Sequence, residues 1–195
     1  PGSKNVPADM AFLRDSQIAG GLIELAGCST AADIVGICGG FQMLGNVIAD
    51  PHGVETSEGE CKGLGLLDIC TILGPDKILQ RTEAIHAMSG HVVNGYEIHH
   101  GRTTMNAGEV LFASRKNDPV GIGTSDHRIW GTYLHGVFDC DKFRRWFVDR
   151  LRSKKGLSPL GKVVSCYDIE PALDRLADIF RETIDVKNLY RLMGL

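Results

Sequence analysis

The chain has 195 residues, of which 43% are hydrophobic and 23% are charged, and its formal net charge is −3. This composition is ordinary for a globular protein, with enough apolar material for one sizeable core but not for two large domains. The small net charge, without a long run of either sign, argues against a nucleic-acid groove and against a membrane-binding surface. No apolar run approaches the length of a membrane span, and no signal peptide is visible.

Six cysteines are scattered along the chain without a CxxC pair or a regular framework. In a chain of this length such a pattern indicates reduced thiols rather than disulfides, and therefore a cytoplasmic protein. Many of the 24 glycines fall where predicted strands give way to loops, which is where α/β enzymes place their sites.

The first third of the chain alternates helix and strand signals. A turn-like segment, Pro1 to Asn5, opens it, and because such turns commonly follow a strand in α/β units we expect preceding strands outside this sequence. Apolar residues at helical spacing then predict two helices, followed by a short buried strand and a further helix that stops at the turn-forming run 50–53. The predicted ranges are 9–13 and 18–26 for the first helices, 34–37 for the strand and 41–47 for its helix.

The middle of the chain is rich in strands and the last third is helical. The polar, acidic and glycine-containing residues 54–63 predict a loop between the two regions of regular structure. The helix–strand–helix order at the start favours α/β layering, with the later strands added to the same sheet. The predicted strands are 64–72, 77–86, 95–103, 109–113, 119–123 and 128–134, and the predicted final helices are 142–152, 170–184 and 188–193.

Cys38 occupies the apex of a sharp turn between the buried strand and its helix. The glycines at 36, 39 and 40 give the spacing G-x-C-x-G, which is that of a nucleophile elbow with cysteine in place of serine. Small neighbours are needed there because the nucleophile sits in a strained turn. The N-terminus of the following helix would favour a thiolate and, later, an oxyanion. The alternative is a small buried cysteine in a glycine-rich loop, and the glycine spacing favours the nucleophile.

A thiolate nucleophile needs a base, and His135 is the best candidate among seven histidines. It ends a predicted strand, and the carboxyl ends of strands in open α/β sheets converge on one crevice, so His135 and Cys38 can meet there. The adjacent His99 and His100 would point to opposite faces of a strand, so we expect no metal site. A Cys–His pair beside a helix N-terminus suits acyl transfer from an amide or thioester.

The elbow, read from Gly36 to Gly45, resembles that of the class I glutamine amidotransferases, and most closely that of their cobyric acid synthase branch. The resemblance implies an α/β, flavodoxin-like three-layer sandwich that lacks its first strands and ends in C-terminal helices. It also implies that residues 1–195 form a single glutamine amidotransferase domain, a fragment of a longer enzyme. The other segments that resemble this branch are 1–5, 50–51, 63–68, 95–101 and 131–139.

The resemblance further implies the role of each site residue. The domain would hydrolyse glutamine through a thioester on the cysteine, with the histidine as base. The implied roles are Cys38 as nucleophile, His135 as base, Gln42 as a holder of the substrate glutamine, and Gly39 with the turn at Gly2 and Ser3 as donors to the oxyanion.

In the family the ammonia passes to a separate N-terminal, ATP-dependent synthetase domain. That domain, which uses ATP and Mg, amidates carboxylates of adenosylcobyrinic acid a,c-diamide in cobalamin biosynthesis. The sequence contains no GxxxxGK[ST] motif, so the synthetase half is not expected in these residues. The resemblance therefore implies no cofactor in this domain, a prokaryotic cytoplasm, and glutamine, the synthetase domain and the corrinoid as partners, with no nucleic acid and no membrane.

One departure from the wider class leaves the orientation of His135 open. Many class I amidotransferases carry H-x-E, whereas here Val137 stands where the glutamate would be, as in the cobyric acid synthase branch. Candidates for the orienting group are Asp139 and Glu97, and a water, a backbone carbonyl or a partner domain is equally plausible. The structural alternatives are a helix N-cap for Asp139 and a solvated strand position for Glu97. Tyr96, Glu97 and His99 are expected to line the site or a domain interface, with simple sheet packing as the alternative.

Two other functions remain open at this point. A cysteine peptidase of related fold would use the same elbow, and a non-catalytic docking module would keep only the fold. Gln42 and the segment 95–99 argue against a peptidase, and the intact Cys38 and His135 argue against a docking module.

Overall fold

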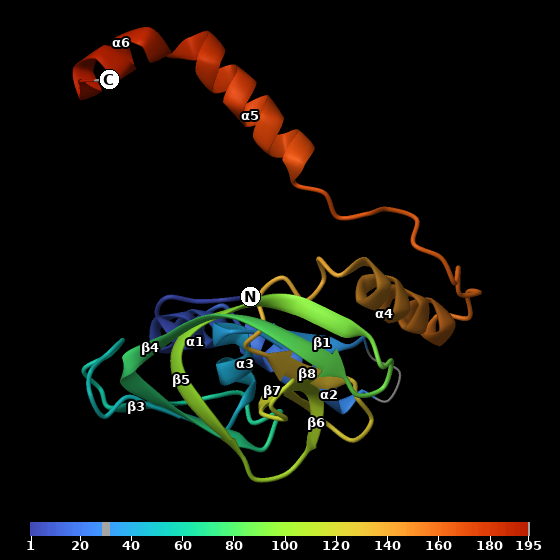
Figure 1. The fold of residues 1–195 in the computed structure, drawn as a ribbon. Coiled ribbons are helices and arrows are strands. Elements are labelled where there is room, and N and C mark those ends of the chain that lie inside the picture. Colours follow the sequence, from blue (N-terminus) through green and yellow to red (C-terminus); the bar gives the residue numbers. More distant parts are fainter. Residues whose placement is uncertain (29–31, 195) are drawn as a thin grey trace. The chain divides into compact units, whose positions relative to one another are not determined.

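A computed structural model of the chain describes residues 1–28 and 32–194. The chain divides into two compact units, Pro1–Gly161 and Lys162–Leu195 (Figure 1). The first unit holds the sheet and the helices around it, and the second holds α5 (Glu170–Thr183) and α6 (Val186–Met193). The assignment of all residues to one amidotransferase domain stays a prediction.

The first unit opens with the two predicted helices, α1 (Val6–Asp15) and α2 (Ile18–Gly27). Helix α1 begins earlier than predicted because the Asn5 side chain accepts a hydrogen bond from the Ala8 N–H at 3.1 Å. Such a cap satisfies one of the N–H groups that a helix leaves free at its start, and a proline in the first turn suits the same position.

Strand β1 (Ile34–Ile37) lies parallel to β8 (Ile129–Thr132), with Ile37 opposite Thr132. Helix α3 (Gly39–Leu44) follows β1. It begins and ends earlier than the predicted helix 41–47. The prediction is wrong for its last residue, Val47, which begins β2 (Val47–Ala49). Gly45 adopts an extended conformation, and the next N–H, that of Asn46, donates to the Ile69 carbonyl at 2.8 Å. The chain therefore joins the sheet where the sequence pattern continues the helix.

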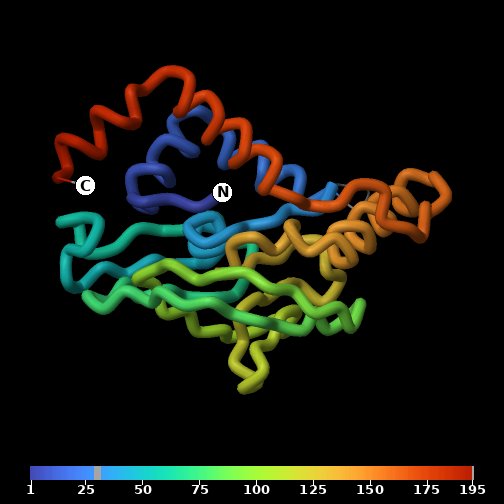
Figure 2. The backbone as a smooth tube through the Cα atoms, turned by 45° about the horizontal axis from the view of Figure 1, so that its top comes forward, coloured from blue at the N-terminus to red at the C-terminus, as the bar shows by residue number. Residues whose placement is uncertain are grey.

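The remaining strands complete one sheet, most of whose pairs are antiparallel. A long strand, β4 (Ile69–His86), replaces the two strands predicted for this region, and its register with β5 (Val92–Met105) shifts between Leu73 and Ile78. Figure 2 shows β4 and β5 running side by side in green. The sheet order is β1-β8-β7-β6-β4-β2-β3, with β5 beside β4. The strands not yet bounded are β3 (Glu60–Lys62), β6 (Glu109–Ser114) and β7 (Pro119–Gly123).

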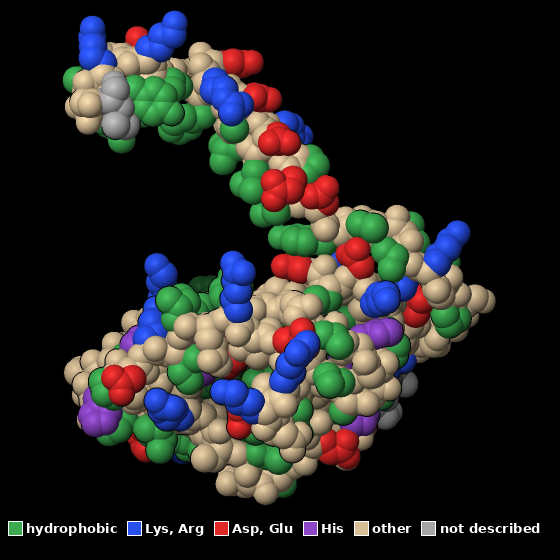
Figure 3. Space-filling model, in the orientation of Figure 1, with side chains coloured by type: hydrophobic (Ala, Val, Ile, Leu, Met, Phe, Trp, Pro, Cys, Tyr) green, Lys and Arg blue, Asp and Glu red, His purple; other side chains and the backbone are tan. Residues whose placement is uncertain are grey.

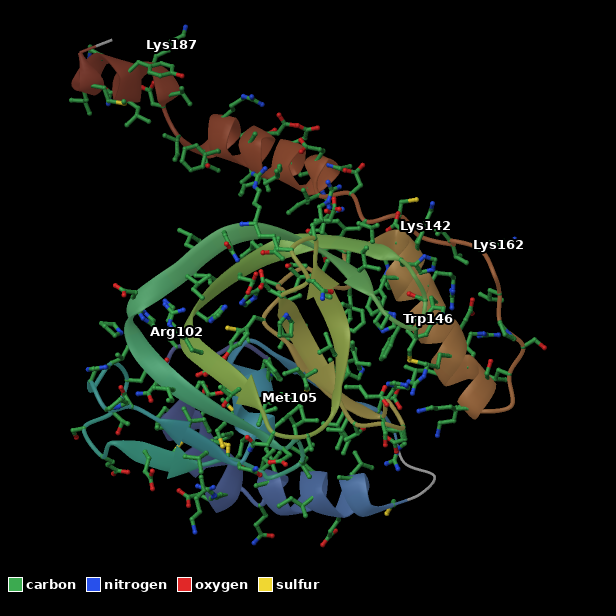
Figure 4. All side chains as sticks on the ribbon, turned by 60° about the horizontal axis from the view of Figure 1, so that its bottom comes forward. Arg102, Met105, Lys142, Trp146, Lys162 and Lys187 are labelled. Atoms are coloured by element: carbon green, nitrogen blue, oxygen red, sulfur yellow. The ribbon has the colours of Figure 1, made fainter. Side chains whose placement is uncertain are left out.

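Helices cover both faces of the sheet at β1, as a three-layer α/β fold requires. Ile34 of β1 belongs to an apolar cluster against which Leu25 of α2 packs. Its neighbour Val35 packs against a second cluster, which includes Phe143 of α4 (Asp141–Lys154). Figure 4 shows Trp146 on the side of α4 that faces the sheet. The predicted fold class is therefore confirmed.

The second unit consists of two amphipathic helices. Neither α5 nor α6 contains a buried residue among those described, and apolar side chains lie along both (Figure 3). None of the helices in the described parts of the chain is long and apolar enough to cross a membrane.

Candidate active site

Cys38 lies at the junction of β1 and α3 in a strained backbone conformation, with φ 52° and ψ −108°. Residues with a side chain rarely adopt a positive φ, and such strain is characteristic of functional turns. Two hydrogen bonds hold the turn. The Cys38 N–H donates to the Thr132 carbonyl at 2.8 Å, and the Gln42 N–H donates to the Cys38 carbonyl at 3.2 Å. The elbow geometry predicted from the glycine spacing is therefore present.

The glycines beside Cys38 allow other backbone segments to approach closely. A Cβ at Gly36 would lie 2.6 Å from the Gly40 carbonyl oxygen, and one at Gly39 would lie 2.7 Å from the Ser3 Cβ. The Gly40 N–H donates to the Pro1 carbonyl at 2.8 Å. The segment 1–3 thus packs directly on the elbow.

Most of the predicted site residues line one cavity of about 320 Å³. Tyr96 and Glu97 are not part of its lining but contact residues that are, as described below. The cavity lining also contains residues to which sequence reasoning gave no role, among them two lysines that supply positive charge. From the prediction the lining includes Gly2, Ser3, Cys38, Gly39, Gln42, His99 and His135, and the residues missed are Lys4, Glu55, Lys77, Ile98 and His100.

His135 is held by the backbone of Tyr96. The His135 N–H donates to the Tyr96 carbonyl at 2.8 Å, and the Tyr96 N–H donates back to the His135 carbonyl at 3.2 Å. The two rings stack with centroids 4.9 Å apart and an interplanar angle of 7°. This approach depends on Gly95, because a Cβ there would overlap the His135 carbonyl oxygen.

The imidazole of His135 and the side chain of Cys38 border the same small space beside Gly2. A Cβ built on Gly2 would lie 3.3 Å from the His135 Cε1 and 3.8 Å from the Cys38 Cβ. The His135 Nε2 is buried and has no hydrogen-bond partner within the described parts of the chain. A buried ring nitrogen without a hydrogen-bond partner costs folding free energy, and such groups often have a catalytic role. This nitrogen can therefore accept a hydrogen bond or a proton from a substrate.

The surroundings favour an uncharged thiol and an uncharged imidazole at rest. Burial raises the pKa of Cys38, and the hydrogen bond from the Gly39 N–H opposes that rise. Burial lowers the pKa of His135, and a second, smaller lowering comes from the charge of His99. The thiol donates to the Ile98 carbonyl, with sulfur and oxygen 3.7 Å apart. The site therefore holds a thiol beside a neutral base.

Neither predicted candidate for orienting His135 makes a described hydrogen bond to its ring. The Asp139 N–H donates to the Gly136 carbonyl at 2.9 Å. Helix α4 has Cys140 at its N-cap, so Asp139 is not the predicted cap either. The alternative of a solvated Glu97 is wrong, because this side chain is buried and its carboxylate lies 3.2 Å from the His99 Nε2.

Gln42 is fixed by a buried tyrosine that the sequence did not single out. Its Nε2 donates to the Tyr133 hydroxyl at 3.2 Å, and that hydroxyl shares a hydrogen bond with Thr103 at 2.6 Å. Burial raises the pKa of Tyr133 to about 12, so the phenol stays neutral. The His99 ring stacks on the Tyr133 ring with centroids 3.6 Å apart. Tyr133 stands in the segment 131–139, whose resemblance to a family was the only signal for it.

The described residues contain no group of His, Cys, Asp and Glu arranged to hold a metal ion. The adjacent histidines have separate partners, since the His99 Nδ1 lies 2.7 Å from the Gly101 carbonyl oxygen and the His100 Nδ1 lies 3.0 Å from that of Gly74.

Comparison with known proteins places this geometry in a family. Residues 1–143 match the profile of the CobB/CobQ-like glutamine amidotransferase domain. A cobyric acid synthase from Nitratidesulfovibrio vulgaris is 45% identical over all of this chain, which spans 42% of that protein. The adenosylcobalamin biosynthesis bifunctional protein CobDQ from Leptospira interrogans is 44% identical over all of this chain, which spans 23% of it.

A solved glutamine amidotransferase has the same fold, with a TM-score of 0.57, 15% identity, and coverage of 80% of this chain and 77% of its own. In the cobyric acid synthases the matching region is the C-terminal part. The profile match covers most of the chain and includes Cys38 and His135. The chain therefore belongs to the family of CobB/CobQ-like glutamine amidotransferase domains.

Proposed function

We propose that this chain is the glutamine-hydrolysing domain of a cobyric acid synthase, with Cys38 as nucleophile and His135 as base. One observation carries the proposal: the strained Cys38 and His135, whose ring nitrogen Nε2 has no hydrogen-bond partner among the described residues, line the same cavity. A glutamine side chain that enters this cavity brings its carboxamide to the sulfur, with Gln42 beside it.

The reaction follows from the resting protonation states. As the Cys38 sulfur attacks the amide carbon, the thiol proton moves to the neutral imidazole of His135, and a C–S bond forms. The imidazolium then gives this proton to the leaving nitrogen as the C–N bond breaks, which releases ammonia and leaves a thioester. Water, deprotonated by the same imidazole, attacks the thioester and releases glutamate and the thiol.

Backbone N–H groups stabilise the negative oxygen of each tetrahedral intermediate. The Gly39 N–H, at the start of α3, points to the sulfur side of the cavity and is suited to this role. The Gly40 N–H is not available, because it already donates to the Pro1 carbonyl. The turn at Gly2 and Ser3, which lines the cavity, supplies the second donor in this proposal.

The ammonia serves a synthetase domain of the same polypeptide. The relatives named cobyric acid synthase extend well beyond this region, which is their C-terminal part. In the proposed scheme their N-terminal part uses ATP and Mg to activate carboxylates of adenosylcobyrinic acid a,c-diamide in the cytoplasm, and ammonia from this cavity amidates them. The glutaminase domain itself uses no cofactor.

Replacing Cys38 by alanine in the full-length enzyme tests the assignment. Glutamine-dependent amidation should be lost, while amidation with added ammonium salts should persist, because only the ammonia source is destroyed. Cys70→Ala, which removes a half-buried thiol of β4 outside the cavity, is the matched control and should keep both activities. A Cys38→Ala enzyme that still uses glutamine would refute the proposal.

A further inference from the structure

A buried carboxylate–imidazole pair, of which the imidazole belongs to the cavity wall, has no part in the proposed reaction. Glu97 and His99 lie on the same face of β5, with exposed fractions of 5% and 6%. Buried ionisable groups are retained only when they are paired and hydrogen-bonded, and they cluster at functional sites. His99 lines the Cys38 cavity, while Glu97 stands behind it.

Both ring nitrogens of His99 lie against oxygen atoms of the protein. Its Nδ1 lies 2.7 Å from the Gly101 carbonyl oxygen, and its Nε2 lies 3.2 Å from the Glu97 Oε2. Both neighbours are acceptors, and an imidazole has two N–H donors only when it is protonated. The contacts are therefore fully satisfied by an imidazolium and only half satisfied by the neutral ring.

The partner of His99 is built to remain a carboxylate. The Glu97 Oε1 accepts hydrogen bonds from the Thr82 hydroxyl at 2.5 Å and from the Gln80 amide at 3.0 Å. Burial favours the protonated acid, but the hydrogen bonds from His99, Thr82 and Gln80 outweigh it and lower the pKa of Glu97. All these donors come from the β4–β5 pair, in which Gln80 stands opposite Glu97.

We propose that Glu97 keeps His99 as an imidazolium in the wall of the Cys38 cavity, where this fixed positive charge acts as a positioning group for the thiol–imidazole pair. The inference rests on the proposed function and adds a role that the reaction scheme lacks. A positive charge at this place holds His135 neutral and ready to accept a proton. It also lowers the cost of forming a thiolate on Cys38 in a buried setting.

The stacked ring of Tyr133 links this charge to substrate binding. The His99 ring stacks on the Tyr133 ring, and the Tyr133 hydroxyl accepts a hydrogen bond from the Gln42 amide. The same pair thus fixes both the electrostatics of the cavity and the direction of Gln42.

Other charged and titratable groups face the cavity and the pair. Tyr96 stacks on His135, and Tyr133 stacks on His99. Lys4, Glu55, Lys77 and His100 share the cavity lining. On the other side, Arg81, Glu83, Arg102, Arg115, Lys116 and Asp118 line a hollow to which Glu97 and His99 also contribute.

The test uses the full-length enzyme with Glu97→Gln, which keeps the shape of the side chain and removes its charge. Loss of the carboxylate should leave His99 neutral, so that the pKa of His135 and the pKa of Cys38 both rise. We expect the acidic limb of kcat/KM for glutamine, and the pH midpoint of Cys38 alkylation by iodoacetamide, to move upward by about one pH unit. Glu97→Asp, which keeps the charge, should restore most of the wild-type profile.

The control is Glu83→Gln on β4, where the carboxylate pairs with Arg115. It should leave both pH profiles unchanged. A second measurement, the ¹⁵N chemical shifts of the His99 ring at pH about 7, should show two protonated nitrogens in the wild-type enzyme and a neutral ring in Glu97→Gln.

Unchanged pH profiles in a folded Glu97→Gln enzyme would overturn the inference, as would a neutral His99 in the wild-type spectrum. If Glu97→Gln does not fold, His99→Asn must give the same upward shift, and an unshifted profile overturns the inference equally. Failure of the proposed function has a different signature, namely a wild-type enzyme whose Cys38→Ala variant still hydrolyses glutamine.

Discussion

At the scale of single residues, the site depends on two glycines of β5 at which even a Cβ atom would overlap its neighbours. Gly95 lets His135 pair with the backbone of Tyr96. Gly101 leaves room for the Gln42 amide and the Tyr133 hydroxyl, both of which a Cβ would overlap. Neither glycine has a positive φ, so the requirement at these positions is space rather than backbone freedom.

Replacing Gly101 by alanine should displace Gln42 and Tyr133. Overpacking of a well-packed interior costs about 1–3 kcal/mol, so we expect a lower free energy of unfolding together with a raised KM for glutamine. Urea unfolding and steady-state kinetics measure the two effects. Gly74→Ala is the matched control, because a Cβ there would meet its nearest atom at 3.8 Å. A Gly101→Ala enzyme with wild-type KM would contradict the role given to Gln42.

His86 should make stability depend on pH. It packs against Phe112, Phe143 and Trp146, and burial, followed by the charges of neighbouring basic groups, lowers its pKa to about 4. The unfolded chain binds a proton near pH 6.5, so the folded state loses stability as the pH falls from about 6.5 to about 4.

The loss attributable to His86 is up to about 3 kcal/mol, since each pKa unit corresponds to about 1.4 kcal/mol. Free energies of unfolding of the wild type and of His86→Gln, measured between pH about 7 and about 4, give this contribution as the difference between the two slopes. Parallel curves would show that the pKa of His86 is the same in the folded and the unfolded chain, which would contradict this account.

At the scale of elements, the loop after β2 is organised by one buried carboxylate. Asp50 accepts hydrogen bonds from the N–H groups of Val54, Glu55 and Thr56 at 2.7, 2.7 and 2.8 Å. Glu55 in turn accepts from the Val6 N–H at 2.7 Å and thereby ties the loop to the start of α1. The sequence predicted only a helix stop at this aspartate, because a turn signal does not reveal which N–H groups a side chain will collect.

Asp50→Ala should therefore lower the free energy of unfolding by about 2–3 kcal/mol, since it leaves three partly buried N–H groups without this acceptor. Burial raises the pKa of Asp50, but the three N–H donors outweigh it and the net pKa is lowered. The stabilisation is thus present above pH about 4, the unfolded value, and is lost as the pH falls below it. Denaturant titrations at pH about 7 and about 3 should show a larger difference from the wild type at the higher pH, because part of the stabilisation is lost between the two. An equal difference at both values would refute the charge-based account.

The elements that the sequence predicts correctly carry strong local signals, and those it misses do not. The β1–Cys38–α3 unit follows from three glycines around a cysteine. β2 was missed because Val47–Ala49 continue the apolar spacing of the helix before them, and a sheet contact decides between the two. β4 was divided in two because Gly74 and Pro75 signal a break, whereas the strand passes through them with a shift of register.

At the scale of the whole molecule, the site is assembled by strand pairing. The sequence predicts that Cys38 and His135 converge, and both residues line one cavity, in the segments that follow the parallel strands β1 and β8. The Tyr133–Gln42 contact, which joins α3 to the segment after β8, could not be predicted from the sequence, because it depends on how the strands are ordered in the sheet. The hydrogen bonds from Gln80 and Thr82 to Glu97 could not be predicted either, since they depend on the register of β4 with β5. The roles proposed for these contacts, like the catalytic roles of Cys38 and His135, stay predictions.

In the second unit, Lys162–Leu195, none of the described residues is buried. The apolar side chains of α5 and α6 are exposed, and Leu192 reaches 77%. Isolated helices of 14 and 8 residues are marginal in water without a packed face. A peptide of residues 162–195 should therefore show low helicity by circular dichroism, a gradual thermal transition, and a rise in helicity with trifluoroethanol. The peptide with Leu173→Ser and Leu192→Ser is the control and should behave alike in water, because no packing is lost. A cooperative thermal transition of the unmodified peptide would show instead that the two helices stabilise each other through their apolar faces.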